Sequence, residues 1–284
     1  MKIKPPFMTE KSPSRLLILA VAILFLFSGA LVLSSYILAV DSPFLLLRGG
    51  DNSDSTERTQ LETILHYATS RVVPQQSLAE IKVSFDVLLS RAPCNFLVFG
   101  LGHDSQMWHS FNPRGTTLFL EEDPKWVQTI LKTAPFLNAR HVIYRTKLSE
   151  ADKLLQSYRW QPECTQMMFL RGNDKCRLAL TELPEEVYDK EWDLIMIDAP
   201  RGYFPEAPGR MAAIYSAAVM ARNRKGKGET HVFLHDVDRR VEKAYAEEFL
   251  CRKYLVQSKG RLWHFEIPSP NTTASDSLPN TVFC

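Results

Sequence analysis

The sequence carries almost no net charge. Its 34 lysine and arginine residues nearly balance 32 acidic residues, so the formal charge is +2 over 284 residues. This balance argues neither for nor against a polyanionic partner, and local clusters must decide. The basic run at residues 222–227 could meet an acidic polymer, but a charge run before a strand is more commonly a solvated loop. We expect no nucleic-acid partner.

Cysteines are few, and their number, five, is odd. At least one thiol is therefore unpaired or intermolecular if the others form disulfides. Cys164 and Cys176 flank one loop and are the first candidate pair. Isolated reduced thiols are the alternative, because spacing alone does not fix the geometry that a bridge needs.

Charged residues are absent from residues 16–40. A helix over this stretch would span roughly 38 Å at about 1.5 Å per residue, which is enough to cross a bilayer. The apolar region of a cleaved signal peptide is shorter, about 7–15 residues, so we expect a transmembrane anchor. Basic residues precede the stretch and acids follow it. The positive-inside rule therefore keeps the N-terminus cytoplasmic and translocates the rest of the chain.

Glycine is also scarce at the one turn where a dinucleotide-binding fingerprint would need three. Residues 96–99 predict a short buried strand, and Gly100 and Gly102 break it into a turn that can approach a ligand closely. Ser105 stands where the third glycine would be. A nicotinamide oxidoreductase is therefore disfavoured, and a tight strand-to-helix turn without a ligand is the alternative to a nucleotide site.

Acidic residues end the next predicted strand, residues 117–120, at Glu121 and Glu122. A carboxylate at this place can hold both hydroxyls of a ribose. A glycine-poor turn followed by a ribose-binding acid suits S-adenosylmethionine, which has no pyrophosphate, better than NAD. We expect Glu121 and Glu122 to bind this cofactor together with the two glycines of the turn.

Strands and helices alternate along most of the chain. This order predicts an α/β fold, a Rossmann-like sheet of the class I methyltransferase type with helices on both faces and a C-terminal antiparallel hairpin. The expected strands are residues 96–99, 117–121, 141–144, 192–198, 231–234, 254–258 and 261–267. Helices are expected at 61–68, 78–88, from 105, from 124, and at 149–158, 211–222 and 241–250, and Ser77 with Glu80 has the spacing of a capping box.

Candidate catalytic residues follow the fourth and fifth of these strands. Asp198, His235 and Asp236 would meet at the carboxyl edge of a parallel sheet, where ligands collect. On neighbouring strands Asp198 and Asp236 would lie roughly 5 Å apart, close enough to share a divalent cation as metal ligands. Two such carboxylates repel, so a metal or an adjacent cation is needed. Either acid could instead cap the following helix.

Methyl transfer to a sugar hydroxyl requires an in-line arrangement, removal of the hydroxyl proton and exclusion of water. Asp198 or His235 could take the proton, directly or from a cation-bound alcohol. Arg201, just beyond the fourth strand, is placed to bind a substrate carboxylate with two guanidinium nitrogens. A solvent-exposed loop arginine is the alternative for this residue.

Specific residue blocks give the chain a family resemblance. Between about residues 94 and 267 it resembles the plant glucuronoxylan 4-O-methyltransferases, in blocks 96–105, 118–123, 170–174, 192–200, 206–210 and 232–237. The resemblance implies methyl transfer from S-adenosylmethionine to O4 of glucuronic acid side chains on xylan, in the Golgi during secondary-wall synthesis. It also implies a divalent cation. A more distant similarity to catechol methyltransferases favours Glu121 over Glu122 for the ribose and leaves the third metal ligand open.

Two alternatives accompany this expectation. Members of the same family methylate glucuronic acid on arabinogalactan, and the sequence does not separate the two acceptors. A non-catalytic Golgi protein that organises xylan synthesis with other proteins is the second alternative. The intact cofactor-binding edge, with Gly100, Gly102, Glu121 and Asp198, counts against it.

The expected organisation is that of a single-pass type II protein of the Golgi membrane. Asn271 begins a glycosylation sequon that would be usable only in the lumen. The segments are a cytoplasmic tail (1–15), a transmembrane anchor (16–40), a stem (41–58), a lumenal methyltransferase domain (59–268) and a polar tail (269–284).

Overall fold

The computed structural model describes residues 50–165, 169–270, 283 and 284. The predicted cytoplasmic tail, anchor and sequon, with the first half of the predicted stem (residues 41–49), lie outside these residues. Within the described part, no helix has both the length and the apolar character that a membrane crossing needs. The chain divides into two units, Met1–Arg58 and Thr59–Cys284. The second unit carries all seven strands of the sheet.

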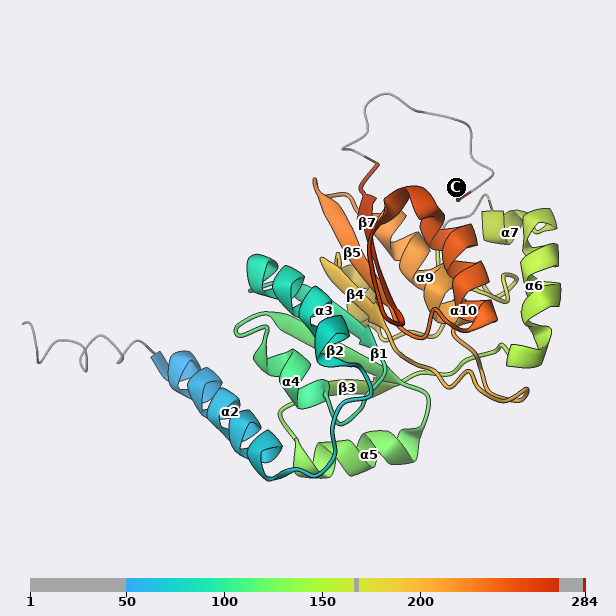
Figure 1. Ribbon diagram of the computed structural model, residues 1–284. Coiled ribbons are helices and arrows are strands. Elements are labelled where there is room, and N and C mark those ends of the chain that lie inside the picture. Colours follow the sequence, from blue (N-terminus) through green and yellow to red (C-terminus); the bar gives the residue numbers. More distant parts are fainter. Residues whose placement is uncertain (1–49, 166–168, 271–282) are drawn as a thin grey trace, which may run out of the picture. The chain divides into compact units, whose positions relative to one another are not determined.

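Seven strands form one sheet in the order β3-β2-β1-β4-β5-β7-β6 (Figure 1). The first five strands are parallel, and β7 pairs antiparallel with both β5 and β6. This confirms the predicted methyltransferase-type sheet with its closing hairpin. The strands are β1 (Asn95–Phe99), β2 (Thr116–Glu121), β3 (Asn138–His141), β4 (Leu194–Ile197), β5 (Glu229–Leu234), β6 (Leu255–Lys259) and β7 (Leu262–Pro268).

The central strands are apolar on both faces because helices cover both faces. One buried cluster joins alternate residues of β1, β2 and β4 to α6 (Ala151–Ser157), α9 (Met211–Arg222) and α10 (Arg240–Tyr245). The other cluster joins the intervening residues to α3 (Leu78–Arg91), α4 (Ser105–Ser110) and α5 (Pro124–Thr133). The period of two in each strand thus divides the core into two layers (Figure 1).

The predicted position of the third strand is wrong by three residues. Strand β3 covers Asn138–His141 rather than residues 141–144. Its pairing with β2 ends at the Glu121–His141 pair, because β2 itself ends there. The apolar residues Val142–Tyr144 therefore continue beyond the sheet edge, where they line a cavity beside the candidate site.

Helix α2 (Gly50–Thr69) begins inside the stretch expected to be a stem. Its apolar residues Leu61, Ile64 and Leu65 are exposed, so they do not cover the sheet. A polar face makes the contacts instead: Thr63 shares a hydrogen bond with Ser110. Side-chain hydrogen bonds, which helical periodicity does not report, orient this helix. In α3, by contrast, the predicted capping box of Ser77 and Glu80 is confirmed.

Two disulfides are present among the described residues. The Cys164–Cys176 pair confirms the first candidate from the sequence. Cys251 and Cys284 form a second bridge that the sequence did not predict, and Cys94 is a buried free thiol. Phe283, beside Cys284, is buried against the core. The last two residues of the predicted polar tail therefore pack onto the domain.

Candidate active site

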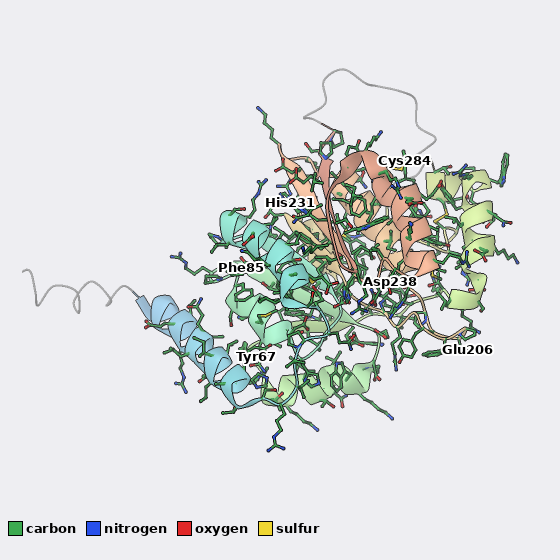
Figure 2. All side chains as sticks on the ribbon, viewed as in Figure 1. Tyr67, Phe85, Glu206, His231, Asp238 and Cys284 are labelled. Atoms are coloured by element: carbon green, nitrogen blue, oxygen red, sulfur yellow. A yellow bond between two sulfur atoms is a disulfide. The ribbon has the colours of Figure 1, made fainter. Side chains whose placement is uncertain are left out.

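A cavity of about 460 Å³ opens at the carboxyl ends of β1, β2, β4 and β5. This is the edge at which the sequence predicted the site. The predicted residues that line the cavity are Gly100, Gly102, Glu121, Glu122, Asp198, Arg201 and Asp236, and His235 does not line it. Figure 2 places Asp238, two residues beyond Asp236, at this end of the sheet and His231 toward the other end.

The turn after β1 requires glycine at its first position. Gly100 has a φ of +130°, and a Cβ there would lie 3.2 Å from the Cβ of Ala199. The loops that follow β1 and β4 therefore pack closely against each other, because Gly100 has no side chain to separate them. Ser105, in place of a third glycine, accepts a hydrogen bond from the Gly102 N–H at 2.9 Å. The serine fixes the turn that a dinucleotide fingerprint would fix with glycine.

Glu121 is held by the backbone around the turn. Its Oε2 accepts from the Leu101 N–H at 3.1 Å, and its Oε1 accepts from the Asp123 N–H at 3.0 Å. Burial, and secondly the neighbouring Glu122, raise the pKa of Glu121 to about 8. The structure thus presents an oriented carboxyl group at the end of β2, as ribose binding requires.

Glu122 and Arg201 form an ion pair beside Glu121. The Arg201 side-chain Nε–H and backbone N–H both donate to Glu122 Oε1, at 3.0 and 3.1 Å. Glu122 Oε2 is buried and has no hydrogen-bond partner among the described residues. A second cavity of about 370 Å³ adjoins this pair and is also lined by Tyr144, whose buried hydroxyl likewise lacks a described partner. This space offers unsatisfied polar atoms to a ligand.

The carboxylate of Asp198 is held in one orientation by contacts to both of its oxygens. His235 Nδ1 lies 2.8 Å from its Oδ1, and Gln76 Nε2 donates to its Oδ2 at 3.1 Å. Burial alone would raise the pKa of Asp198, but the hydrogen bond from His235 and the charge of Arg210 hold it well below its ordinary value. The side chain is 25% exposed, so an ionised, oriented carboxylate faces the cavity.

His235 acts on Asp198 rather than on the cavity. Its side chain is fully buried. The other ring nitrogen, Nε2, lies 3.9 Å from Glu80 Oε1 and has no described hydrogen-bond partner. In this geometry His235 cannot take a proton directly from a hydroxyl in the cavity. It is a positioning residue that fixes the Asp198 carboxylate.

Arginines surround Asp236. Its Oδ2 pairs with Arg210 at 2.8 Å and Arg239 at 2.9 Å, and its Oδ1 pairs with Arg261 at 2.6 Å. Arg210 also reaches Asp198 Oδ1 at 3.4 Å. The sequence required a metal or an adjacent cation between the two acids, and Arg210 is such a cation.

The predicted metal ligands do lie together, since the ligand atoms of Asp198, His235 and Asp236 fall within 4.8 Å of one another. They do not fit a divalent cation in this arrangement. Both oxygens of Asp236 already accept from guanidinium groups. A dication placed between the acids would also lie against the positive charge of Arg210. The arrangement therefore favours the arginine over a metal as the cation that the two acids share.

Sequence reasoning assigned no role to several residues of the site. These residues are Gln76, Arg210 and Arg239, which come from different segments of the chain. No local sequence motif predicts that they contact Asp198 or Asp236. Asp104 also lines the cavity, and burial, followed by the charge of Asp198, raises its pKa to about 6. Of these four residues, only Asp104 had a local sequence feature that could have indicated a place in the site, namely its position beside the glycine turn.

Comparison with known proteins gives the family. The model of the IRX15/IRX15L/GXM family matches residues 79–265. The chain belongs to this family. It is 58% identical over 274 residues to arabinogalactan O-methyltransferase 2 of Arabidopsis thaliana, with 94% of each chain covered. It is 51% identical over 227 residues to glucuronoxylan 4-O-methyltransferase 1 of Arabidopsis thaliana, covering 80% of this chain and 79% of the relative.

Among solved structures, a methyltransferase-like protein from Silicibacter pomeroyi matches with a TM-score of 0.39 and 14% identity. That match covers 70% of this chain and 90% of the other. Membership of the IRX15/IRX15L/GXM family and the Arabidopsis relatives put the chain among the O-methyltransferases. The cofactor expected for the sheet, S-adenosylmethionine, fits an edge that presents a glycine turn and an oriented carboxyl group.

Proposed function

We propose that the protein transfers a methyl group from S-adenosylmethionine to a hydroxyl of glucuronic acid on arabinogalactan. The observation that carries the choice of acceptor is the 58% identity to an arabinogalactan O-methyltransferase over nearly the whole of both chains. The xylan acceptor expected from the sequence becomes the second candidate, supported by the 51% identity to a glucuronoxylan 4-O-methyltransferase. O4 of the uronic acid is the proposed position.

The cofactor is proposed to lie along the ends of β1 and β2. Gly100 and Gly102 admit its amino-acid end, and Glu121 binds the two ribose hydroxyls. Glu122 and Tyr144, whose unsatisfied polar atoms adjoin the second cavity, would hold the base. When bound, S-adenosylmethionine supplies an electrophilic methyl group on a sulfonium.

Asp198 orients the acceptor hydroxyl and takes its proton. The low pKa of Asp198 keeps it ionised, ready to accept a hydrogen bond from the hydroxyl. Such a carboxylate is a weak base, so proton transfer accompanies formation of the carbon–oxygen bond. His235 and Gln76 keep the carboxylate in one orientation during this step. The products are the methyl ether, S-adenosylhomocysteine as the leaving group, and a proton on Asp198 that passes to solvent.

Two arginines at the cavity are proposed to bind the uronate carboxylate. Arg201 is 47% exposed and Arg239 is 32% exposed, so both combine a charge with access to the cavity. We expect Arg201→Gln to raise KM for the acidic acceptor about tenfold and to leave the Kd for S-adenosylmethionine unchanged, because one charge-assisted contact is lost. Steady-state kinetics measures this change. Arg240→Gln, a surface control paired with Asp152, should leave KM unchanged.

Glu121 is expected to govern the pH dependence of cofactor binding. With a pKa raised to about 8, its carboxyl is mostly protonated at neutral pH in the free protein. Two ribose hydroxyls donate best to the ionised form, so binding releases a proton. The Kd for S-adenosylmethionine should therefore fall as pH rises toward about 8, by at most about tenfold per pH unit, and then level off.

Isothermal calorimetry over this pH range measures the effect. Glu121→Gln should bind the cofactor more weakly and lose this pH dependence. Glu182→Gln, which changes a carboxyl group away from the cavity, should behave as the wild type. A wild-type Kd that stays constant from about pH 6 to about pH 8 would contradict the assignment.

The test of the proposed function is methyl transfer from labelled cofactor by the purified chain. Arabinogalactan and glucuronoxylan are offered separately, each with and without a chelator. Label mainly on arabinogalactan supports the proposal, and label mainly on xylan overturns the choice of acceptor. No label on either by folded protein would favour the non-catalytic alternative. Activity lost with chelator and restored by a divalent cation would support the cation expected from the resemblance.

A Golgi location is part of the proposal. Its support is the uncharged stretch at residues 16–40 and the charge difference across it, with the catalytic domain on the lumenal side. The proposed partners are the acidic polysaccharide, the Golgi membrane and other polysaccharide-synthesis proteins. Protease protection in intact microsomes, with Asn271→Gln as a probe of lumenal glycosylation, tests this topology. Digestion of the C-terminal domain without detergent would overturn it.

A further inference from the structure

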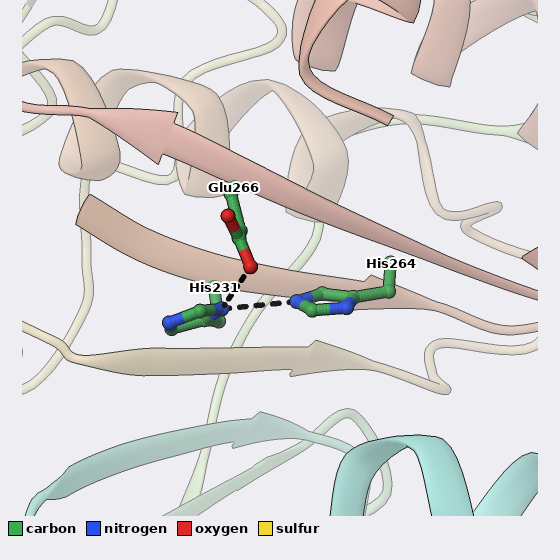
Figure 3. Close-up of side chains that lie close together, drawn as sticks. All are labelled: His231, His264 and Glu266. Carbon is green, nitrogen blue, oxygen red and sulfur yellow. Dashed lines mark hydrogen bonds and ion pairs between the residues drawn. The ribbon is translucent and has the colours of Figure 1, made fainter. Parts of the chain in front are cut away.

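Three potential metal ligands cluster away from the candidate active site. His231 lies in β5, and His264 and Glu266 lie in β7. In the antiparallel register His231 is directly opposite Glu266, and His264 is opposite Phe233, two residues further along β5. All three side chains therefore project from the same face of the sheet. Figure 3 shows the His231 ring facing both His264 and Glu266.

This cluster is separate from the methyl-transfer site. His231 is four residues before His235 in the same extended segment, a separation of roughly 13 Å at about 3.3 Å per residue. None of the three residues lines either cavity. A role for the cluster is therefore independent of the proposed function.

The distances suit one small cation. His231 Nδ1 lies 3.0 Å from His264 Nε2 and 3.7 Å from Glu266 Oε1, and the ligand atoms of the three residues all lie within 4.8 Å of one another. Ligands about 2.0–2.2 Å from a tetrahedral Zn²⁺ are separated from one another by about 3.3–3.6 Å. The two distances from His231 lie within a few tenths of an ångström of this spacing, and the partly exposed Glu266 side chain would make any larger adjustment toward His264.

The protonation of both imidazoles also suits metal binding. Both rings are buried, and burial lowers the pKa of His231 to about 4 and that of His264 to about 3. Neutral imidazole is the form that coordinates a metal. Glu266 is 43% exposed on its side chain, which gives an ion a route from solvent.

An unsatisfied atom points to the same conclusion. His231 Nε2 is buried without a hydrogen-bond partner among the described residues, and Glu229 Oε1 lies 3.6 Å from it. If Nδ1 binds a metal, Nε2 must carry the proton and can donate it to Glu229. This is the carboxylate–histidine–metal order found around protein metal sites. Arg91 pairs with the same Glu229 and holds the carboxylate in place.

We propose that His231, His264 and Glu266 form a Zn²⁺ site, with water as the fourth ligand. Two imidazoles and one carboxylate favour zinc over magnesium or calcium, which prefer oxygen ligands only. The bound ion links β5 to β7 and so stabilises the junction between the parallel sheet and its closing hairpin. It takes no part in methyl transfer.

The test uses the full chain, purified without a histidine tag and stripped of metal. Calorimetric titration with ZnSO₄ should give one site, and Co²⁺ substitution should give the visible absorption of a four-coordinate centre. Zn²⁺ should raise the Tm of the wild type. Glu266→Gln, a partly exposed change, should weaken Zn²⁺ binding at least tenfold and abolish the Tm shift, and Glu229→Gln should weaken it about 10–100-fold.

Two controls separate this cluster from other groups. Asp236→Asn changes one of the acids of the candidate active site, and His109→Gln removes a histidine of α4. Both variants should bind Zn²⁺ with the affinity of the wild type. No Zn²⁺ binding by the folded wild type would overturn the proposal and leave a hydrogen-bonded histidine pair. Equal binding by Glu266→Gln and the wild type would overturn it as well. Neither result bears on methyl transfer.

Discussion

Asp198→Asn is expected to lower kcat by about 10²–10⁴-fold, the usual contribution of a positioned acid–base group. The substitution removes the carboxylate that faces the acceptor hydroxyl but keeps the shape of the side chain. The Kd for S-adenosylmethionine should change little, because Gly100, Gly102 and Glu121 are untouched. Single-turnover kinetics with labelled cofactor, beside calorimetric cofactor binding, separates the two effects.

The matched control for this substitution is Asp238→Asn, an exposed aspartate two residues beyond Asp236. It should keep wild-type kcat. A second comparison, His235→Gln, should reduce kcat less than Asp198→Asn, because His235 only orients the carboxylate. If Asp198→Asn turned over the acceptor at the wild-type rate, Asp198 could not be the group that takes the proton.

Arg210→Met is expected to produce the largest loss of stability. Arg210 is 5% exposed and pairs with both Asp198 and Asp236, and it also donates to the backbone carbonyl of His235 at 2.7 Å. Removing it takes one of three arginines from Asp236 and the only described arginine from Asp198. Breaking a buried pair of this kind costs about 3–5 kcal/mol. For a domain of this size the Tm should fall by roughly 10 °C.

The pH dependence of this loss has a defined sign. The folded-state pKa of Asp198 is lowered, so its contribution is present above the unfolded pKa of about 4 and is lost as pH falls through the folded value. The stability difference between wild type and Arg210→Met should therefore narrow below about pH 4. Thermal unfolding across pH measures it. The control Arg252→Met removes an exposed ion pair with Glu247 and should lower the free energy of unfolding by less than about 1 kcal/mol. An equally small loss of stability for Arg210→Met would contradict the proposed role of Arg210 as the cation that the two acids share.

The charge arrangement explains why the metal expectation was reasonable and yet does not fit. From the sequence, strand neighbours place Asp198 and Asp236 close together, and two close carboxylates need a cation. The structure supplies that cation from Arg210, which follows a loop after β4 and precedes α9. The sequence pattern indicates that the two carboxylates need a nearby positive charge, but it does not indicate which residue or ion provides that charge.

Local patterns in the sequence determined the fold and the part of the site proposed to bind the cofactor. Most of the apolar strands, the Gly100 turn and the acid at Glu121 follow from neighbouring residues, so their positions along the chain were predicted, whereas β3 begins three residues before its predicted position. The Cys164–Cys176 bridge closes a short loop, and its candidate pair was correct. The two layers of the core also follow from the period of two in each strand.

Tertiary structure alone decided what surrounds those residues. Gln76 meets Asp198 across 122 positions of the chain, and Arg261 meets Asp236 across 25. The end of β3 was set by the end of its partner strand, and the Cys251–Cys284 bridge by packing of the terminus. Periodicity and motifs report which face of an element is apolar, whereas ion pairs and hydrogen bonds depend on which distant segments the folded sheet brings into contact.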